Sequence, residues 1–208
     1  MRAVRNKRKS LPPSRCVIVG ISGIDASGKG FVAERLAERL REDGYTVAVI
    51  GGDGWLHLPE KRYAKTNPGE HFFLNGFRFD ELFQQLIVPL RTKRTVWLKA
   101  NHTEQTAQHY RQKVYDLREV DIAILECIFL FQPAYESHFD LKIWLECRYE
   151  TALARALARG QEGLSPQETI QEFERIYFPA QRLHIERDAP RTRADIVYLN
   201  DSPSTNGS

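Results

Sequence analysis

A glycine-rich segment near the N-terminus has the composition of a phosphate-binding loop. Residues 20–30 are GISGIDASGKG, and residues 23–29 match the pattern GxxxxGK. Glycines allow a tight turn in which successive backbone N–H groups point at phosphate oxygens, and the lysine adds a full positive charge. We therefore predict that a nucleotide binds through the following residues: Gly23, Ile24, Asp25, Ala26, Ser27, Gly28, Lys29 and Gly30. The alternative is a strand–turn–helix junction in which the lysine is incidental.

Position 30 departs from the usual form of this loop. A Ser or Thr normally follows the lysine and binds Mg²⁺ through its hydroxyl group, whereas this chain has Gly30. Mg²⁺ often retains several waters, so a water could take the place of the hydroxyl. We expect the affinity for Mg²⁺ to be reduced, and the sequence leaves open whether it is lost.

Two acidic residues lie at or near the ends of apolar runs. Asp53 follows VAVIGG, and Glu126 lies within AILECIF. An acid at a strand end beside a phosphate-binding loop can hold Mg²⁺ or its waters, or accept a proton from a substrate hydroxyl. Asp53 could instead be a turn residue, and Glu126 a hydrogen-bonded acid in the core. We favour functional roles, because an acid among apolar neighbours needs a cation or another partner.

Short apolar runs alternate with amphipathic segments along the chain. Buried strands are predicted from runs rich in Val, Ile and Leu at 16–21, 45–52, 121–131, 140–146 and 194–200, with a weaker alternation at 95–100. Helical spacing of apolar residues predicts helices at 31–43, 79–91, 150–160 and 165–178. This order predicts an α/β fold with a parallel sheet covered on both faces, and ligands bind beyond the carboxyl ends of such strands.

The chain of 208 residues, 42% of them hydrophobic, fits one domain. No apolar run approaches the ~20 residues that cross a bilayer, and residues 1–15 lack the apolar segment of a secretory signal. We therefore expect a cytoplasmic protein without a membrane partner.

Charge is concentrated at the N-terminus. Residues 1–15 hold six Lys or Arg and no acid, and we interpret them, like residues 202–208, as a disordered tail. The rest of the chain carries 24 basic against 27 acidic residues, so nucleic acid is not expected as a partner. Salt-sensitive binding through the basic tail is the weakest of three hypotheses about function.

Several motifs in one order resemble the uridine kinase-like group of the phosphoribulokinase/uridine kinase family. They are GISGIDASGKG, GGDGWL, GEHFFLNGFRFDEL, DIAILECIFLF, FDLKIWLECRYETALARALARG and YFPAQRLHIERDAPRTRADIVYLND, and the similarity runs over residues 16–201. The resemblance implies one kinase domain with the P-loop NTPase fold, a three-layer α/β/α sandwich with a parallel sheet and a short lid. It also implies ATP and Mg²⁺ as cofactors, and transfer of the γ-phosphoryl group of ATP to a hydroxyl of a small molecule, typically a nucleoside.

The resemblance implies roles for residues at matching positions. Asp53 would accept the hydroxyl proton and stand near the metal, Lys29 would hold the outer phosphates, and Glu126 would belong to the metal site. Trp97 and His102 fall where nucleoside kinases place a Tyr and a His around the base of the substrate. Considered alone, Trp97 would fit a core or half-buried strand position better.

Two arginines lead into the expected lid. Arg155 and Arg159 are four residues apart on a predicted helix and so share one face, and the resemblance implies that they clamp the charge of the transferred phosphoryl group. Considered alone, such arginines are more often solvated surface residues. The segment GQEGLSP after Arg159 lacks the Asp and the further arginines that the family places in its lid.

Two further departures concern the acceptor and the metal site. The segment HFFLNGFRFD lacks the acid that binds ribose hydroxyls in uridine kinases, with Leu74 near that place, and Cys127 replaces a glycine after Glu126. We predict a kinase of a small hydroxylated acceptor, a nucleoside or another metabolite, whose identity the sequence leaves open. The alternative is a non-catalytic module that binds ATP or GTP and has a degenerate metal site. The oligomeric state stays open, with a homo-oligomer as one alternative.

Overall fold

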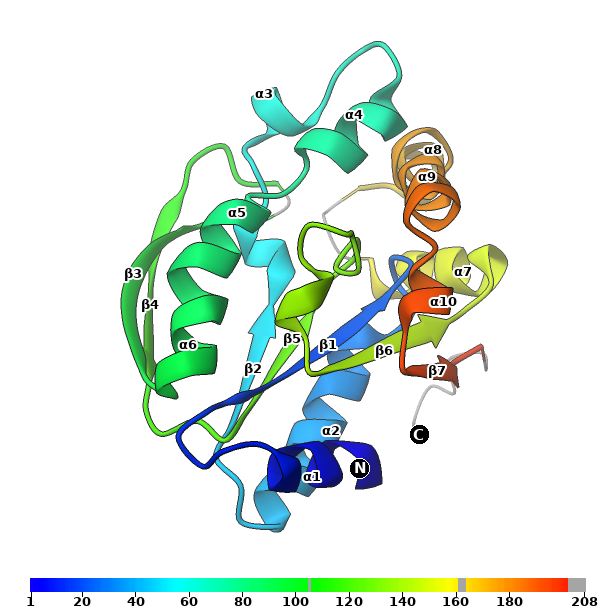
Figure 1. Ribbon diagram of the computed structural model, residues 1–208. Coiled ribbons are helices and arrows are strands. Elements are labelled where there is room, and N and C mark those ends of the chain that lie inside the picture. Colours follow the sequence, from blue (N-terminus) through cyan, green and yellow to red (C-terminus); the bar gives the residue numbers. More distant parts are fainter. Residues whose placement is uncertain (105, 161–163, 202–208) are drawn as a thin grey trace.

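The computed structural model describes residues 1–104, 106–160 and 164–201. Its centre is a five-stranded sheet in the order β2-β5-β1-β6-β7, in which every neighbouring pair is parallel (Figure 1). The strands are β1 (Val17–Gly23), β2 (Val47–Gly51), β5 (Ile122–Glu126), β6 (Leu141–Glu146) and β7 (Ile196–Leu199). The prediction of an α/β fold with a parallel sheet is confirmed.

One face of the sheet is covered by α2 (Lys29–Glu42), which follows β1 after the glycine-rich loop. Its residues Ala33, Ala37 and Leu40 recur at helical spacing and are fully buried in the core on this side of the sheet. Neighbouring side chains of β1 point to opposite faces, and all of them are buried. Burial on both faces explains why this strand has a continuous apolar sequence.

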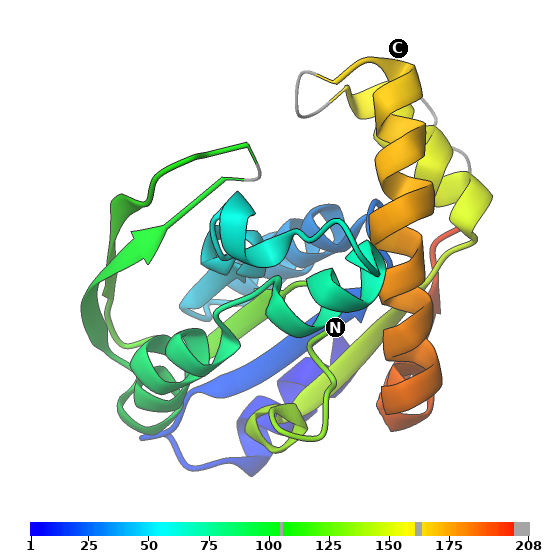
Figure 2. The same cartoon turned by 90° about the horizontal axis from the view of Figure 1, so that it is seen from above.

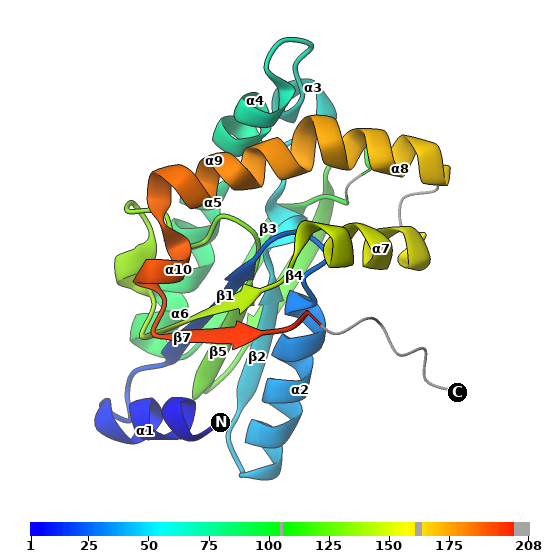
Figure 3. The same ribbon diagram turned by 90° about the vertical axis from the view of Figure 1, so that its right-hand side faces the viewer.

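Helices from later parts of the chain cover the other face. They are α4 (Pro68–Asn75), α5 (Phe79–Leu82) continued by η2 (Phe83–Ile87) and α6 (Val88–Lys93), α7 (Tyr149–Arg159), and α8 (Pro166–Glu172) continued by η4 (Phe173–Tyr177) and α9 (Phe178–Asp188). Figure 3 shows α8, η4 and α9 as one long helix with α7 beside it. The predicted three-layer sandwich is confirmed. Across the residues that the structure describes, none of the helices could cross a membrane.

Both long helices on this face contain a wider turn just before a proline. The π-type turns η2 and η4 end two residues before Pro89 and Pro179. A proline lacks the N–H that would bond to the carbonyl four residues back, and its ring crowds that carbonyl, so a wider turn relieves the conflict. The second of these turns carries Tyr177, which lines the cavity described below.

An antiparallel hairpin stands apart from the main sheet. It consists of β3 (Val96–His102) and β4 (Arg111–Leu117), and Figure 2 shows it curving outward on the side of the molecule opposite α8 and α9. The strand predicted at 95–100 is therefore confirmed, although it lies outside the main sheet. β4 was not predicted, because most of its residues are exposed and give no apolar alternation. The remaining short elements are η1 (Gly52–Trp55), α3 (Pro59–Arg62), η3 (Glu136–His138) and α10 (Pro190–Arg193).

The prediction of a disordered N-terminal tail is wrong for most of residues 1–15. Residues Arg2–Ser10 form α1, and its Val4 is buried among the core residues on the α2 side of the sheet. The Arg8 guanidinium is also buried, and it donates hydrogen bonds to the carbonyls of Pro12 (3.1 Å) and Arg15 (2.6 Å). The basic composition gave no indication of this packing, because only Val4 and Arg8, one helical turn apart, are buried among exposed charged residues. Residues 202–208, also predicted to be disordered, lie outside the described residues.

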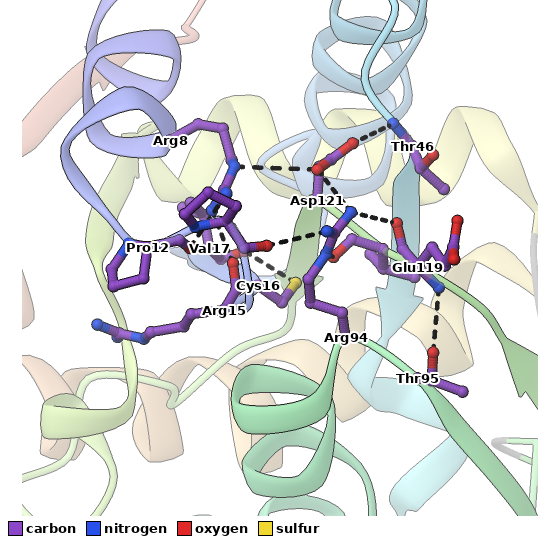
Figure 4. A network of polar contacts seen from close by, with 12 residues as sticks. Arg8, Pro12, Arg15, Cys16, Val17, Thr46, Arg94, Thr95, Glu119 and Asp121 are labelled. Carbon is purple, nitrogen blue, oxygen red and sulfur yellow. Dashed lines mark hydrogen bonds and ion pairs between the residues drawn. The ribbon is translucent and has the colours of Figure 1, made fainter.

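A network of charged groups joins α1 to the amino ends of the strands. The Asp121 carboxylate accepts hydrogen bonds from Arg94 Nη2 (2.8 Å) and from the Thr46 backbone N–H (3.0 Å), and Arg8 Nε lies 3.9 Å away (Figure 4). Asp121 directly precedes β5, so the network lies at the edge of the sheet opposite the glycine-rich loop. It therefore anchors the N-terminal helix without taking part in the site.

Candidate active site

The glycine-rich loop connects the carboxyl end of β1 to the N-terminus of α2, as predicted. β1 ends at Gly23 and α2 begins at Lys29. Gly28 has a φ of 91°, and a Cβ at this position would lie 2.6 Å from Asn200 Nδ2, so conformation and space both require glycine. Lys29 is buried, and its Nζ donates a hydrogen bond to the carbonyl of Ile24 at 2.9 Å. This contact holds the ammonium group within the loop.

Asp53 and Glu126 lie together at the carboxyl edge of the sheet, beside Lys29. The register of β2 and β5 pairs Gly51 with Glu126, and Asp53 follows two residues later in η1. Burial and the charge of Asp53 raise the pKa of Glu126 to about 7. The Asp53 side chain is exposed to solvent, and the residues around it form the walls of the cavity described below. Desolvation by these walls and the charge of Asp25 therefore raise its pKa as well.

A cavity of about 60 Å³ opens beside Asp53. Charged side chains from four different elements or loops line this cavity together with aromatic rings. The lining residues are Asp25, Asp53, Leu56, Arg62, Tyr63, Phe72, Phe77, Ile128, Arg159 and Tyr177. The hydroxyl groups of Tyr63 and Tyr177 are hydrogen-bonded to each other at 3.0 Å, which joins the two sides of the aromatic wall. The cavity therefore has a carboxylate of the glycine-rich loop, Asp25, and the carboxylate of Asp53 in one lining.

The acids at this edge have the chemistry that Mg²⁺ requires. Glu126 and Asp53 provide carboxylate oxygens, which this cation prefers as ligands. Among the described residues, no group of three or more His, Cys, Asp or Glu is arranged as a complete metal cage. A partial set suits Mg²⁺, which usually completes its coordination with waters and substrate phosphates.

The two predicted arginines have different surroundings. Arg159 lines the cavity with Asp25 and Asp53, so its positive charge lies beside the two carboxylates. Arg155 instead donates hydrogen bonds to the backbone carbonyls of Ser27 (3.3 Å) and Asn200 (2.9 Å). Its contacts hold the glycine-rich loop against the end of β7, which indicates a positioning role.

The two residues predicted around a substrate base are not brought together. The His102 ring packs against Gly54, the residue that follows Asp53, because a Cβ added at Gly54 would lie 2.0 Å from His102 Nε2. Trp97 lies five residues earlier on β3, hence on the other face of the strand, and is 69% exposed. Trp97 does not line the cavity beside Asp53, and its contact with a substrate base stays a prediction.

Several residues of the cavity were not predicted. Arg62 and Phe72 come from a segment without a clear period, and Tyr177 lies near the end of a predicted helix, so only the folded chain brings all three to Asp53. Leu74, which falls near the place of the missing ribose-binding acid, is 57% exposed and does not line the cavity. The one available signal was the density of aromatic residues between 55 and 79, which is unusual for a surface loop.

Comparisons with known proteins agree with this arrangement. The model of the "Phosphoribulokinase / Uridine kinase family" matches residues 18–197. A uridine kinase of Alkaliphilus metalliredigens is 28% identical over 194 residues, which cover 88% of this chain and 87% of the relative. A uridine kinase of Serratia proteamaculans is 26% identical over 195 residues, with 89% and 87% covered.

Solved structures show the same fold. The structure of a possible uridine kinase from Bacillus stearothermophilus superposes with a TM-score of 0.72 at 22% identity, covering 94% of this chain and 99% of the other. Phosphoribulokinase from Rhodobacter spheroides gives a TM-score of 0.63 at 13% identity, covering 90% and 71%. Because the family model spans most of the chain, the protein belongs to the phosphoribulokinase/uridine kinase family of P-loop kinases.

Proposed function

We propose that this small-molecule kinase transfers the γ-phosphoryl group of ATP to a hydroxyl group bound in the cavity beside Asp53. The observation that carries the proposal is the convergence of Asp53, Asp25 and Arg159 on one cavity next to the glycine-rich loop. A phosphoryl donor held by the loop and an acceptor held by the cavity would then meet at Asp53.

Each residue of the site has a distinct task in this reaction. Backbone N–H groups of the loop and the ammonium group of Lys29 hold the phosphates of ATP. Asp53 orients the acceptor hydroxyl and takes its proton as the hydroxyl oxygen bonds to the γ-phosphorus and the bond to the β-phosphate oxygen breaks. Arg159 stabilises the charge on the transferred group. Mg²⁺, held through Glu126 and Asp53 or their waters, would neutralise charge on the phosphates when bound.

Gly30 supports a second candidate, a module that binds nucleotide without catalysis. Without the hydroxyl that normally binds Mg²⁺, the site has one protein ligand fewer than the usual loop. The two candidates differ in turnover: the kinase consumes ATP when the right acceptor is present, and the module does not do so with any acceptor.

The test is ATP consumption across a panel of nucleosides, polyols, sugars and hydroxy acids, with Mg²⁺ and with Mn²⁺. Wild-type protein is compared with Asp53→Asn, and Asp116→Asn, which changes an exposed acid on the hairpin, is the control. We expect acceptor-dependent turnover that falls about 10²- to 10⁴-fold in Asp53→Asn and is unchanged in the control. ATP binding without turnover on the whole panel would favour the non-catalytic module.

A further inference from the structure

One residue, Arg78, binds the three backbone carbonyl groups that follow Asp53 along the chain. The Arg78 side chain donates hydrogen bonds from Nη2 to the carbonyl of Gly54 (3.5 Å) and from Nε to that of Leu56 (3.2 Å). The backbone N–H of Arg78 donates to the carbonyl between them, that of Trp55, at 2.8 Å. The turn that carries Asp53 is therefore bound by a single residue, which lies directly before α5.

The same guanidinium also reaches the hairpin. Nη2 of Arg78 donates a hydrogen bond to the carbonyl of Asn101 at 2.7 Å, and Asn101 directly precedes His102 on β3. The guanidinium carbon lies 5.3 Å from the centre of the Trp55 ring and 4.6 Å from the centre of the Tyr110 ring. Tyr110 directly precedes β4, so Arg78 lies in the joint between η1 and both strands of the hairpin.

The contacts of the Arg78 guanidinium fix its orientation. It is buried, and its charge is balanced by Glu81 of α5, whose Oε2 lies 2.7 Å from Nη1. A guanidinium is planar and presents its five N–H donors in a fixed arrangement, so the carbonyls that it binds are held in one relative position. Arg78 is not one of the residues that line the cavity beside Asp53, so its effect on a reaction there would be indirect.

The position of Asp53 decides whether its carboxylate can accept a proton. Along the chain, Asp53 has β2 on one side, which pairs with β5, and the turn bound by Arg78 on the other. A proton acceptor must lie within about 2.6–3.2 Å of the hydroxyl oxygen. A displacement of about 1 Å can lower the rate of a reaction roughly 100-fold. The contacts of Arg78 oppose such a displacement of η1 relative to the hairpin.

We infer that Arg78 is a positioning residue, which holds the turn after Asp53 against the hairpin so that the Asp53 carboxylate meets the acceptor hydroxyl. The inference rests on the proposed kinase function and adds to it a residue outside the cavity. Arg78 acts through Asp53, so its loss should lower the rate of phosphoryl transfer and leave the binding of ATP by the glycine-rich loop unchanged.

The chain offers a matched control in Arg94. Its side chain also donates hydrogen bonds to three backbone carbonyls, those of Pro13 (2.9 Å), Glu119 (2.8 Å) and Val120 (3.2 Å), and to one carboxylate. These contacts lie at the amino ends of the strands, on the opposite edge of the sheet from the glycine-rich loop (Figure 4). Loss of Arg94 therefore removes the same kinds of contact without reaching Asp53.

The first test is kinetic. The variants are Arg78→Gln, Arg78→Lys, Arg94→Gln, Asp53→Asn and the double variant Asp53→Asn/Arg78→Gln. Each is assayed for kcat and for KM with Mg-ATP and the acceptor of the panel that wild type turns over fastest, and the melting temperature of each is measured. The assay temperature lies well below all the melting temperatures, so that unfolded protein does not lower kcat.

Arg78→Gln should lower kcat about 100-fold and leave KM for ATP within about twofold of wild type, whereas Arg94→Gln should lower the melting temperature alone. Arg78→Lys keeps the charge but lacks the planar group, so its kcat should fall only about tenfold. In the Asp53→Asn background, Arg78→Gln should change kcat by less than about twofold, because the carboxylate that it positions is gone. If Arg78→Gln does not fold, Arg78→Lys takes its place in each comparison with the same pattern expected.

The second test needs no acceptor. The backbone N–H of Leu56 donates to the carbonyl of Asp53 (3.3 Å), and that of Thr103 donates to the carbonyl of Gly54 (3.0 Å). Hydrogen exchange at these two N–H groups should become at least about 10-fold faster in Arg78→Gln or Arg78→Lys, while exchange in β1 stays as in wild type. Arg94→Gln should leave both groups unchanged.

Three outcomes would overturn the inference. One is a loss of kcat in Arg78→Gln that is equally large in the Asp53→Asn background, since Arg78 would then act on another group. Another is a rise in KM for ATP with kcat unchanged, and the third is faster exchange throughout the sheet, which would show a general loss of stability. If wild type turns over no acceptor, the kinase function itself fails, and hydrogen exchange alone then decides whether Arg78 holds the turn.

Discussion

Gly30 lies directly opposite Glu126: a Cβ added at position 30 would stand 4.0 Å from Glu126 Oε1 and would meet no other atom within 4 Å. The place of the missing hydroxyl is therefore open and faces a carboxylate of the proposed metal site. Gly51 approaches the same oxygen from β2, where an added Cβ would lie 3.2 Å away. The carboxylate thus lies between two glycines, which leaves its oxygen accessible on the side of the loop.

Gly30→Ser should strengthen the dependence of activity on Mg²⁺. Position 30 is the second residue of α2, and a serine hydroxyl there would add an oxygen ligand beside Glu126 without a clash. We expect the Mg²⁺ concentration for half-maximal activity to fall about 10-fold, measured by titration at saturating ATP. Gly30→Ala is the matched control, since it adds the same Cβ without a ligand. Equal effects of both substitutions would show that the hydroxyl does not reach the metal.

Arg159 and Arg155 should differ in what their loss affects. Arg159→Ala removes a cation from the cavity beside Asp53, so kcat should fall by about 10³-fold while the melting temperature changes little. Arg155→Ala releases the carbonyls of Ser27 and Asn200, so it should lower both the melting temperature and the affinity for ATP. Steady-state kinetics and thermal unfolding of both variants make the comparison. The assignment is wrong if Arg155→Ala reduces kcat alone.

Gly54→Ala should inactivate the enzyme by displacing its neighbour Asp53. The added methyl group would lie 2.0 Å from His102 Nε2, so either the hairpin or η1 must move. We expect kcat/KM to fall about 100-fold or more, because small displacements of reacting groups are costly. The double variant Gly54→Ala/His102→Ala removes the clash and should recover most of the loss. Failure of the second substitution to rescue activity would mean that Gly54 is needed for its backbone conformation instead.

The parts of the site that sequence reasoning could place are those at strand ends. The glycine-rich loop, Asp53 and Glu126 each follow or end an apolar run, and parallel strands bring such positions to one edge of the sheet. Trp97 and His102 show the limit of this logic. The period of two along a strand places residues five apart on opposite faces, and only the folded hairpin shows which of them turns to the site.

Other features depend on loops and on tertiary packing that no local pattern encodes. Arg62 lies in a four-residue helix that follows η1, and the cavity that it lines also contains Tyr177, more than a hundred positions later in the chain. The basic residues of α1 favour an exposed, solvated segment. In the structure, however, Val4 packs into the core and Arg8 donates hydrogen bonds to backbone carbonyls. The tertiary fold decides whether a residue such as arginine is buried or exposed. An apolar run with strand composition, by contrast, is stable in few places other than a buried strand.

Glu126 should make the stability of the protein depend on pH in a specific window. Burial and the charge of Asp53 raise its pKa from 4.5 to about 7 in the folded protein. Between these values the unfolded chain has lost the proton that the folded protein still holds, so the free energy of unfolding falls as pH rises. Below pH 4.5 the carboxyl is protonated in both states, and above pH 7 it is ionised in both, so the effect levels off. Glu126→Gln removes this contribution and should gain stability relative to wild type by about 3 kcal/mol between pH 4.5 and pH 8.

Urea unfolding of wild type and Glu126→Gln at several pH values, in the presence of EDTA, measures this difference. The control is Glu38→Gln, which neutralises an exposed acid on α2. It measures how the same loss of charge at the surface changes the free energy of unfolding. Adding Mg²⁺ and ATP should reverse the order of stability, because the ionised Glu126 would then have a cation as its partner. The prediction is wrong if the free energies of unfolding of wild type and Glu126→Gln differ by the same amount at every pH. The Glu126 carboxyl would then have an ordinary pKa in the folded protein, and neither burial nor the charge of Asp53 would shift it.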